Sequence, residues 1–259
     1  MRVLILGAGE HASSTAHRLF RCGLTVVLTE VPAPLAVRRA VSFCSAVWEG
    51  EVVVEGVRAV HRPLAAALPA APDCVTVVVD PDATLVEGWR PDVLVDARLL
   101  KQPGATSVAQ APLVISLGPG PCAGVDAHVV VETQRGHDLG RLIESGCALP
   151  DTGVPGTIGG HDTTRVLRAP VAGVVRGMRT IGDPVAAGET VAMVGEVPVP
   201  SQIAGVVRGL LRDGTLATPG LKLADVDPRG EPRYCHTLSD KSRTLSGSVL
   251  EAILAHGRR

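Results

Sequence analysis

The first residues whose spacing indicates chemistry are glycines near the N-terminus. The stretch G-A-G-E-H-A at residues 7–12 fits the pattern G-x-G-x-x-A directly after a short apolar run. In this pattern the first glycine permits a tight turn, the second lets a pyrophosphate approach the backbone, and the small third residue allows close helix–strand packing. An acid about 20 residues further on accepts hydrogen bonds from a ribose. The sequence therefore predicts a dinucleotide site at Gly7, Gly9, Glu10, Ala12 and Glu30. The alternative is that the glycines only pack the turn.

Two adjacent arginines follow the predicted ribose-binding acid. Arg38 and Arg39 come soon after a proline-rich turn at residues 30–34. Guanidinium groups bind phosphate through paired hydrogen bonds, so this pair would bind a 2′-phosphate or another phosphate group. The alternative is a solvated helix face on which both arginines form surface ion pairs.

A second glycine loop carries a cysteine. The apolar run at residues 113–117 is followed by G-P-G-P-C, which contains Gly118, Gly120 and Cys122. Backbone N–H groups of such a loop can face an anion, and Cys122 is a candidate thiolate or nucleophile. The alternative for Cys122 is a small buried residue without chemistry.

Chargeable residues gather after this loop, within residues 126–141. Burying so many of them is costly unless they are exposed or arranged in a site. We predict that Glu132, Arg135 and His137 bind a substrate carboxylate or phosphate, with Arg141 as a further anion ligand. Together with Cys122, Glu132 and His137 are the catalytic candidates. A structural hydrogen-bond network is the alternative, and the His and acid spacing matches no metal-site motif.

Composition narrows the class of protein. The chain has 259 residues, 46% apolar and 20% charged, with a formal net charge of −1. This composition is typical of globular proteins, and the charge provides no basic surface for nucleic acid or an anionic membrane. No apolar run is long enough to span a bilayer. The six cysteines show no C-x-x-C or zinc spacing, so we expect them to be mostly reduced and buried in a cytoplasmic protein.

The elements that position these residues predict an α/β fold. We expect a Rossmann-like nucleotide-binding domain with a parallel sheet over residues 1–110, and a glycine-rich polar segment over 111–160 that completes it and leads into a linker. The expected helices lie at 10–22, 82–89 and 239–256, the expected strands at 25–29, 75–79, 92–97 and 113–117, and a hairpin at 46–62. Residues 231–259 carry the last of these helices, which is expected to pack on the core.

A repeat organises residues 161–230. V-A-G-V-V-R-G at residues 171–177 returns as I-A-G-V-V-R-G at 203–209. Neither copy can bury its apolar face alone, so the two must close on each other. The layout resembles the biotinyl/lipoyl barrel-sandwich hybrid domain. The hairpin between the copies, residues 195–201, has no lysine that a carrier would modify, because the chain's lysines are Lys101, Lys222 and Lys241.

Several motifs resemble the YqeB-type selenium-dependent molybdenum hydroxylase accessory proteins. They are G-A-G-E-H-A, E-V-P-A-P-L-A-V-R-R-A-V-S-F, D-V-L-V-D-A-R, L-G-P-G-P-C-A-G-V-D-A-H, V-V-V-E-T-Q-R-G-H-D-L-G-R, D-T-G-V-P-G and S-D-K-S-R. Where similar proteins tend to read G-G-G-D and G-P-G-F, this chain has G-A-G-E and G-P-G-P. Pro121 therefore replaces an aromatic side chain and removes an N–H from the second loop.

The resemblance implies a maturation factor for molybdenum hydroxylases that carry a labile selenium-containing cofactor. Its partners would be the hydroxylase or its cofactor-assembly proteins, and its cofactor NAD(P) or a molybdopterin dinucleotide. Two other hypotheses stay open: an NAD(P)-dependent oxidoreductase acting on a small anion, and a non-catalytic scaffold docking the hydroxylase. The sequence leaves open whether the protein is an enzyme and whether it forms a homodimer.

Overall fold

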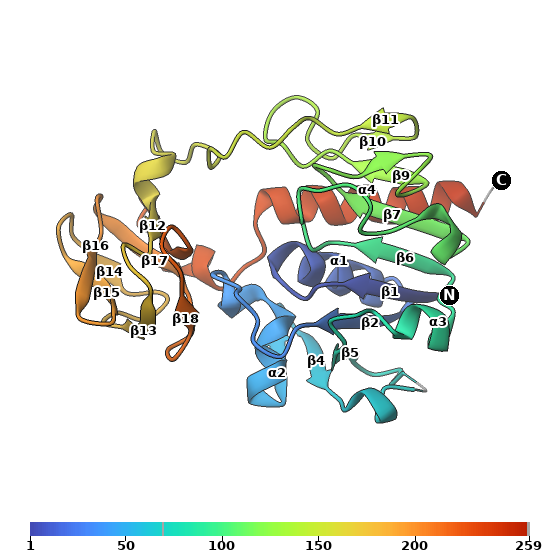
Figure 1. Cartoon of the computed structure of the whole chain (residues 1–259), viewed down its shortest axis with the longest axis horizontal. Coiled ribbons are helices and arrows are strands. Elements are labelled where there is room, and N and C mark those ends of the chain that lie inside the picture. Colours follow the sequence, from blue (N-terminus) through green and yellow to red (C-terminus); the bar gives the residue numbers. More distant parts are fainter. Residues whose placement is uncertain (69, 258–259) are drawn as a thin grey trace. The chain divides into compact units, whose positions relative to one another are not determined.

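The computed structural model describes residues 1–68 and 70–257 (Figure 1). The chain divides into two compact units. Unit 1 consists of Met1–Pro34, Ser42–Thr152 and Leu238–Arg259, and unit 2 of Leu35–Val41 and Gly153–Thr237. Each unit is thus assembled from segments that are far apart in the sequence, and the two are described separately.

Unit 1 is built on a nine-stranded sheet with the order β10-β9-β7-β6-β1-β2-β5-β4-β3. The strands are β1 (Arg2–Leu6), β2 (Thr25–Glu30), β3 (Glu51–Val54), β4 (Val57–His61), β5 (Val75–Val79), β6 (Val93–Asp96), β7 (Leu113–Leu117), β9 (Val129–Val131) and β10 (Leu142–Ile143). All neighbours pair in parallel except β3 with β4 and β10 with β9 at the two edges. The central strands are almost continuously apolar and buried, as is typical of a parallel sheet covered on both faces. The predicted α/β class with a largely parallel sheet is confirmed, whereas the Rossmann-like assignment stays a prediction.

Two long helices belong to unit 1, α1 (Glu10–Arg21) and α4 (Asp240–His256). Both match predicted helices closely, and Ser239 caps α4 by accepting a hydrogen bond from the Ser242 N–H. Their N-terminal turns lie together, since the Ser14 hydroxyl donates to the Ser242 carbonyl at 3.1 Å. The first turn of α4 therefore packs against α1 within unit 1. Among the described residues, no helix combines the length and apolar character needed to cross a bilayer.

The expected hairpin at residues 46–62 is only partly correct. It begins with a short helix, α2 (Ala46–Glu49), and the hairpin proper is β3 with β4. Glu55 and Gly56 form its turn with φ of 44° and 81°. The expected helix at 82–89 is shorter as well, because α3 covers only Leu85–Trp89.

Unit 2 contains two four-stranded sheets, β12-β19-β17-β14 and β16-β15-β13-β18. The strands are β12 (Val166–Arg168), β13 (Gly173–Gly177), β14 (Pro184–Val185), β15 (Thr190–Val194), β16 (Val197–Pro200), β17 (Gly205–Leu210), β18 (Leu216–Ala217) and β19 (Lys222–Asp227). The two copies of the repeat thus give corresponding strands, and they exchange partners, because β14 pairs with β17 and β13 with β18. The prediction that the copies close on each other is confirmed.

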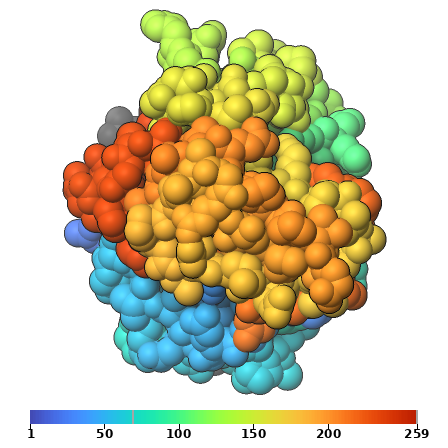
Figure 2. All heavy atoms as spheres, turned by 90° about the vertical axis from the view of Figure 1, so that its left-hand side faces the viewer, coloured from blue at the N-terminus to red at the C-terminus, as the bar shows by residue number. Residues whose placement is uncertain are grey.

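The interior of unit 2 consists of Val, Leu, Ile and Ala side chains supplied by both copies. Val175 and Val207, at matching positions of the repeat, are 1% and 0% exposed. Figure 2 shows the surface of this unit, where segments of the two copies, in yellow and orange, adjoin each other. Since neither copy has a core of its own, the repeat explains the folding of this unit.

Candidate functional site

The glycine turn after β1 is held by hydrogen bonds from several directions. Gly7 has a φ of 91°, which favours glycine, and its N–H donates to the Thr29 carbonyl at 2.9 Å. The Ala8 carbonyl accepts from the Ser13 hydroxyl and from the Cys44 N–H, both at 2.9 Å. The turn is therefore rigid and anchored to β2, α1 and the segment that follows β2.

Gly7 and Gly9 differ in what surrounds them. A Cβ added at Gly7 would lie 3.3 Å from Cγ of Arg98, so the protein itself fills that space. A Cβ added at Gly9 would meet no atom within 4 Å. Gly9 has a φ of −71° and a ψ of −174°, a conformation open to any residue. Neither backbone conformation nor packing thus requires glycine at position 9, and the space beside it is open.

Glu30 lies where the sequence places it, at the end of β2. Its carboxylate accepts the Ala8 N–H at 2.9 Å and the Val31 N–H at 2.8 Å. Burial raises the pKa of Glu30, and these two backbone hydrogen bonds counteract the rise. The carboxylate therefore closes the glycine turn, and binding of a ribose by Glu30 stays a prediction.

Arg98 and Asp96 are site residues that the sequence reasoning missed. Arg98 follows β6, its side chain packs against Gly7, and Asp96 binds its guanidinium through two hydrogen bonds of 2.9 and 2.7 Å. The Arg98 side chain is 26% exposed, so part of the cation remains at the surface. The available signal was an Asp two residues before an Arg at the end of a predicted strand.

The N-terminal turns of α1 and α4 form a polar junction beside Gly9. The Ser242 hydroxyl donates to Glu10 at 3.1 Å and lies 3.0 Å from Nδ1 of His11. The residue before Ser242 in the first turn of α4 is Lys241, whose pKa is lowered by burial and further by the Arg135 cation. Glu10 is thus engaged by α4, and Lys241 is a second site residue that the sequence reasoning did not single out.

The predicted Glu132–Arg135–His137 group does not form one site. Glu132 is 3% exposed, and its carboxylate accepts the N–H groups of Gln134 and Leu149 at 2.7 and 2.8 Å. Arg135 instead binds Asp240 of α4 with two hydrogen bonds of 2.6 and 2.8 Å. His137, in the loop that follows β9, is exposed. These contacts favour the alternative, a hydrogen-bond network that holds the loop.

Arg141 is likewise a surface residue. Its side chain is 70% exposed and lies 3.6 Å from the carboxylate of Asp138. A pair in this setting contributes little to stability because water screens both charges. A role for Arg141 in anion binding stays a prediction.

The second glycine loop packs against its own chain. A Cβ at Gly118 would lie 2.4 Å from Cβ of Ala148, and one at Gly120 would lie 2.5 Å from the Gln102 nitrogen. Gly120 also has a φ of 109°. The hydroxyl of Thr133 donates to the Gly118 carbonyl at 2.5 Å. Close packing of the chain explains both glycines. Anion binding by this loop stays a prediction, and no contact described for the loop supports it.

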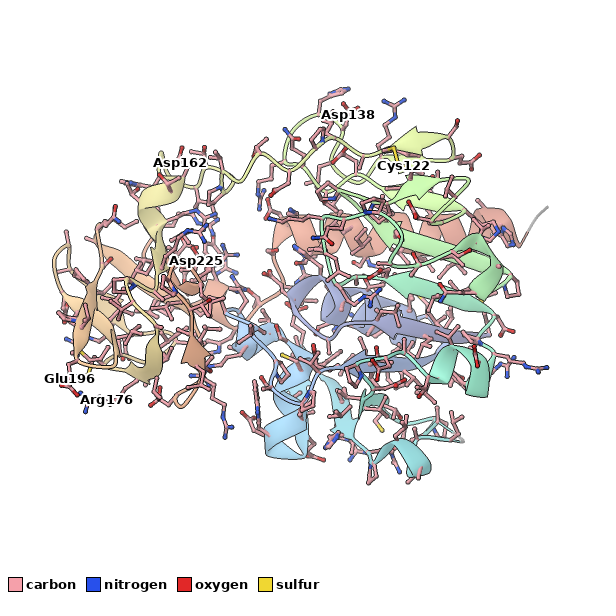
Figure 3. All side chains as sticks on the ribbon, in the orientation of Figure 1. Cys122, Asp138, Asp162, Arg176, Glu196 and Asp225 are labelled. Atoms are coloured by element: carbon pink, nitrogen blue, oxygen red, sulfur yellow. A yellow bond between two sulfur atoms is a disulfide. The ribbon has the colours of Figure 1, made fainter. Side chains whose placement is uncertain are left out.

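Cys122 requires a correction. We expected a thiolate or a buried thiol, but Cys122 forms a disulfide with Cys147, drawn as the yellow bond in Figure 3. The two residues face each other in a separate two-stranded sheet of β8 (Cys122–Ala123) and β11 (Gly146–Cys147). The sequence separation of 25 hid the pair, because a disulfide needs proximity in the fold and not in the sequence.

Arg38 and Arg39 also require a correction, because both belong to unit 2. Arg38 is 6% exposed and donates to the carbonyls of Tyr234 and Thr237, both at 3.2 Å. Arg39 donates to the Leu210 carbonyl at 2.9 Å. Both guanidinium groups therefore bind the backbone of unit 2, and neither forms the phosphate clamp or the solvated helix face considered above.

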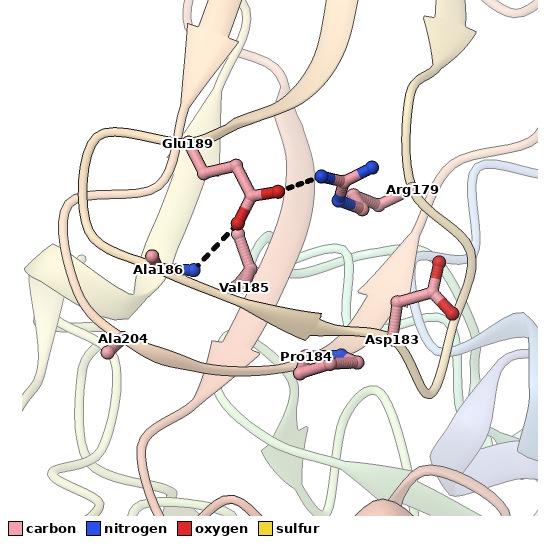
Figure 4. A pocket seen from close by; sticks show the side chains of 7 residues that line it. All are labelled: Arg179, Asp183, Pro184, Val185, Ala186, Glu189 and Ala204. Atoms are coloured by element: carbon pink, nitrogen blue, oxygen red, sulfur yellow. Dashed lines mark hydrogen bonds and ion pairs between the residues drawn. The ribbon is translucent and has the colours of Figure 1, made fainter.

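A surface pocket lies elsewhere, within unit 2 (Figure 4). Arg179 and Glu189 form an ion pair at its wall, and Glu189 also accepts the Ala186 N–H at 2.9 Å. None of the predicted site residues lines this pocket. Within the two described ranges of the chain, no group of three or more His, Cys, Asp or Glu side chains is arranged to hold a metal ion.

No protein-family model matches the chain. Two of the similar solved structures are the product-bound ectoine utilization protein EutE (DoeB) from Ruegeria pomeroyi and an aspartoacylase family protein from Mesorhizobium loti. The first is 16% identical with a TM-score of 0.29, and the match covers 87% of this chain and 84% of the EutE chain. The second is 12% identical with a TM-score of 0.30, and the match covers 87% of this chain and 85% of the aspartoacylase family protein. At these scores neither likeness carries an argument about fold or function.

A curated relative gives a much stronger match. The chain is 45% identical over 254 residues to YqeB, an uncharacterized protein of Escherichia coli strain K12, which covers 97% of this chain and 47% of YqeB. The chain therefore spans about half the length of the curated relative it matches. The similarity supports the resemblance to YqeB-type proteins over nearly the whole of this chain.

Proposed function

We propose that unit 1 binds a dinucleotide through the turn between β1 and α1, in the manner of a Rossmann-like domain. The observation that carries this proposal is the open space beside Gly9, a glycine that neither its backbone conformation nor the packing of the protein requires. Close approach of a pyrophosphate to the backbone would require it. The N-terminus of α1 lies at the same place and favours an anion.

The sheet topology supports this location. From β1 the chain continues to β2 on one side, whereas β6 lies on the other side of β1. Ligands of open parallel sheets bind outside the carboxyl ends of the strands, where the strand order reverses in this way. Lys241, in the first turn of α4, and the exposed part of Arg98 beyond its ion pair with Asp96 would contribute positive charge to a bound anion.

NAD(P) and a molybdopterin dinucleotide share the pyrophosphate that this turn would hold. A specific grip on a 2′-phosphate by Arg38 and Arg39 is not proposed, because both arginines bind carbonyls of unit 2. The residues that would hold the cofactor are Gly9, the first turn of α1, Glu30 and Lys241. When bound, the cofactor would supply hydride transfer if it is NAD(P), or the pterin moiety of a molybdenum centre.

For the biological role, we propose maturation of molybdenum hydroxylases. This role rests on the motifs that resemble the YqeB-type accessory proteins. The 45% identity to YqeB supports the family likeness alone. Unit 2, whose repeat resembles a barrel-sandwich hybrid domain without a carrier lysine, would serve as a rigid platform. The oxidoreductase alternative would need a catalytic acid–base pair. Glu132 is buried and His137 is exposed, so these two catalytic candidates do not favour that alternative.

Calorimetric titration of the whole chain with NADH, NADPH and cytidine–pterin dinucleotide tests the proposal. We expect one of them to bind, and Gly9→Ala to weaken that binding by about tenfold or more because the new methyl group occupies the space of the pyrophosphate. Gly88→Ala is the matched control, since a Cβ there also meets open space but lies on α3. If no nucleotide binds, or if both variants bind like the unmodified protein, the dinucleotide site is wrong.

A further inference from the structure

The disulfide stands apart from the other cysteines of the chain. Cys44, Cys74 and Cys235 are buried free thiols, and Cys22 is an exposed one. All six cysteines lie in the described residues, and only Cys122 and Cys147 are joined. We expect a cytoplasmic protein, and in that compartment a disulfide is more often catalytic or redox-sensing than structural.

The two residues of the disulfide are exposed to different degrees. Cys147 is exposed in the short strand β11, whereas Cys122 is half-buried in β8. In Figure 3 the sulfur–sulfur bond lies beside the β10 and β11 ribbons of unit 1. From this residue exposure we expect an incoming thiolate to attack the sulfur of Cys147 more readily than that of Cys122.

Both cysteines are held in place by bonds other than the disulfide. The Cys122 N–H donates to Asp126 at 2.8 Å, and the other oxygen of Asp126 accepts the Gly104 N–H at 2.8 Å. On the opposite side, the Leu149 N–H binds Glu132 at 2.8 Å, two residues after Cys147. Breaking the sulfur–sulfur bond thus leaves the two cysteines side by side and ready to re-form it.

From this accessibility and anchoring we infer that Cys122 and Cys147 form a redox-active pair that exchanges with small thiols. A thiolate attacks the sulfur of Cys147, forming a mixed disulfide and releasing Cys122 as a thiolate, which takes a proton from water. A second thiolate attacks the incoming sulfur, releasing Cys147 and one small disulfide. The protein disulfide gains two electrons, and two small thiols are oxidised to one disulfide. Glutathione represents the substrate class.

The disulfide also suggests a role for Glu132, which lies among the chargeable residues of the segment 126–141. Glu132, one of the predicted catalytic candidates, instead binds the segment that carries Cys147. Glu132 is accordingly a positioning residue for the pair, acting through the Leu149 N–H. The inference does not depend on the dinucleotide site, because no atom of the glycine turn after β1 takes part in it.

The test uses the whole chain in its native state. We expect reduced glutathione to convert the disulfide to two thiols that a maleimide labels, with no change in the far-ultraviolet circular dichroism, and oxidised glutathione to restore it. In Cys122→Ser, Cys147 should take up one glutathione from oxidised glutathione. In Cys147→Ser, the half-buried Cys122 should react at least about tenfold more slowly. Cys22→Ser, which removes an exposed free thiol, should leave the cycle intact.

Three results would overturn the inference. The pair would be structural if glutathione reduced it only in unfolded protein. It would not exist in solution if mass spectrometry of the untreated chain found six free thiols. Equal rates of glutathione uptake in Cys122→Ser and Cys147→Ser would contradict the assignment of Cys147 as the attacked sulfur. The variant Glu132→Gln should slow re-formation of the disulfide without changing the far-ultraviolet circular dichroism. An unchanged rate of re-formation would contradict the positioning role of Glu132.

Discussion

Two glycine turns of unit 1 follow parallel strands of the same sheet, yet their glycines serve different neighbours. After β1, the position beside Gly9 is open. After β7, the positions beside Gly118 and Gly120 are filled by Ala148 and by the backbone at Gln102. A glycine-rich turn after a strand is thus compatible with a ligand in one case and with close packing of the chain in the other. Only the space around each Cα distinguishes the two.

The largest expected effect concerns the packed turn. Gly120→Ala places a Cβ 2.5 Å from a backbone nitrogen at a φ of 109°, so we expect a loss of roughly 2–4 kcal/mol in the free energy of unfolding. Gly124→Ala is the matched control in the same loop, because its φ is 90° but its Cβ meets open space. It should cost about 1 kcal/mol. Urea denaturation measures both, and equal losses would mean that only the backbone conformation matters.

A smaller effect is expected from the bond that closes the packed turn. Thr133→Val removes the hydrogen bond to the Gly118 carbonyl in a buried setting, which should cost about 1 kcal/mol or slightly more. Thr244→Val removes a similar bond, to the Asp240 carbonyl, at an exposed position where water replaces it. Urea midpoints should therefore change clearly for the first variant and little for the second. The opposite order would contradict the view that Thr133 holds this turn.

The Glu30 carboxylate accepts hydrogen bonds from the backbone of the turn after β1. The stability of the folded protein should therefore depend on the protonation of Glu30 and so on pH. Burial raises the pKa of Glu30 above the ordinary value of 4.5, so the folded state holds the proton more tightly than the unfolded chain. The contribution of Glu30 to stability is complete below pH 4.5 and declines as the pH rises through its folded pKa. Urea denaturation across this window should show a decline that Glu30→Gln lacks. Glu87→Gln, which replaces an exposed carboxylate on α3, should leave the decline in place.

The smallest expected change in stability belongs to Gly9 itself. Because its Cβ would meet no atom and its φ is −71°, Gly9→Ala should change the free energy of unfolding by less than about 0.5 kcal/mol. Combined with the expected loss of nucleotide binding, this result would separate ligand contact from folding at one position. A loss above 1 kcal/mol would instead place Gly9 with the packed glycines of the second turn.

Local pattern predicted the main strands and helices of this protein, although it missed β8 and β11 and made α3 too long. The apolar runs of β5 and β7 coincide with the expected strands, and α1 and α4 follow the expected helices. The repeat likewise predicted the paired copies of unit 2, because a short apolar strand must find a partner to cover it. Hydrophobic periodicity and glycine positions are patterns over a few neighbouring residues. The sequence alone therefore predicts the strands and helices that depend on them.

Contacts between distant residues decided the site. Whether Cys122 is a thiol depended on Cys147, whether Glu132 is free depended on Leu149, and whether Arg38 meets a phosphate depended on the carbonyls of unit 2. Arg98 and Lys241 became site residues only when their elements were placed beside the first turn. The types of these residues are visible in the sequence, but their hydrogen-bonding partners and burial are set by tertiary packing, which brings together chain segments that no local pattern connects.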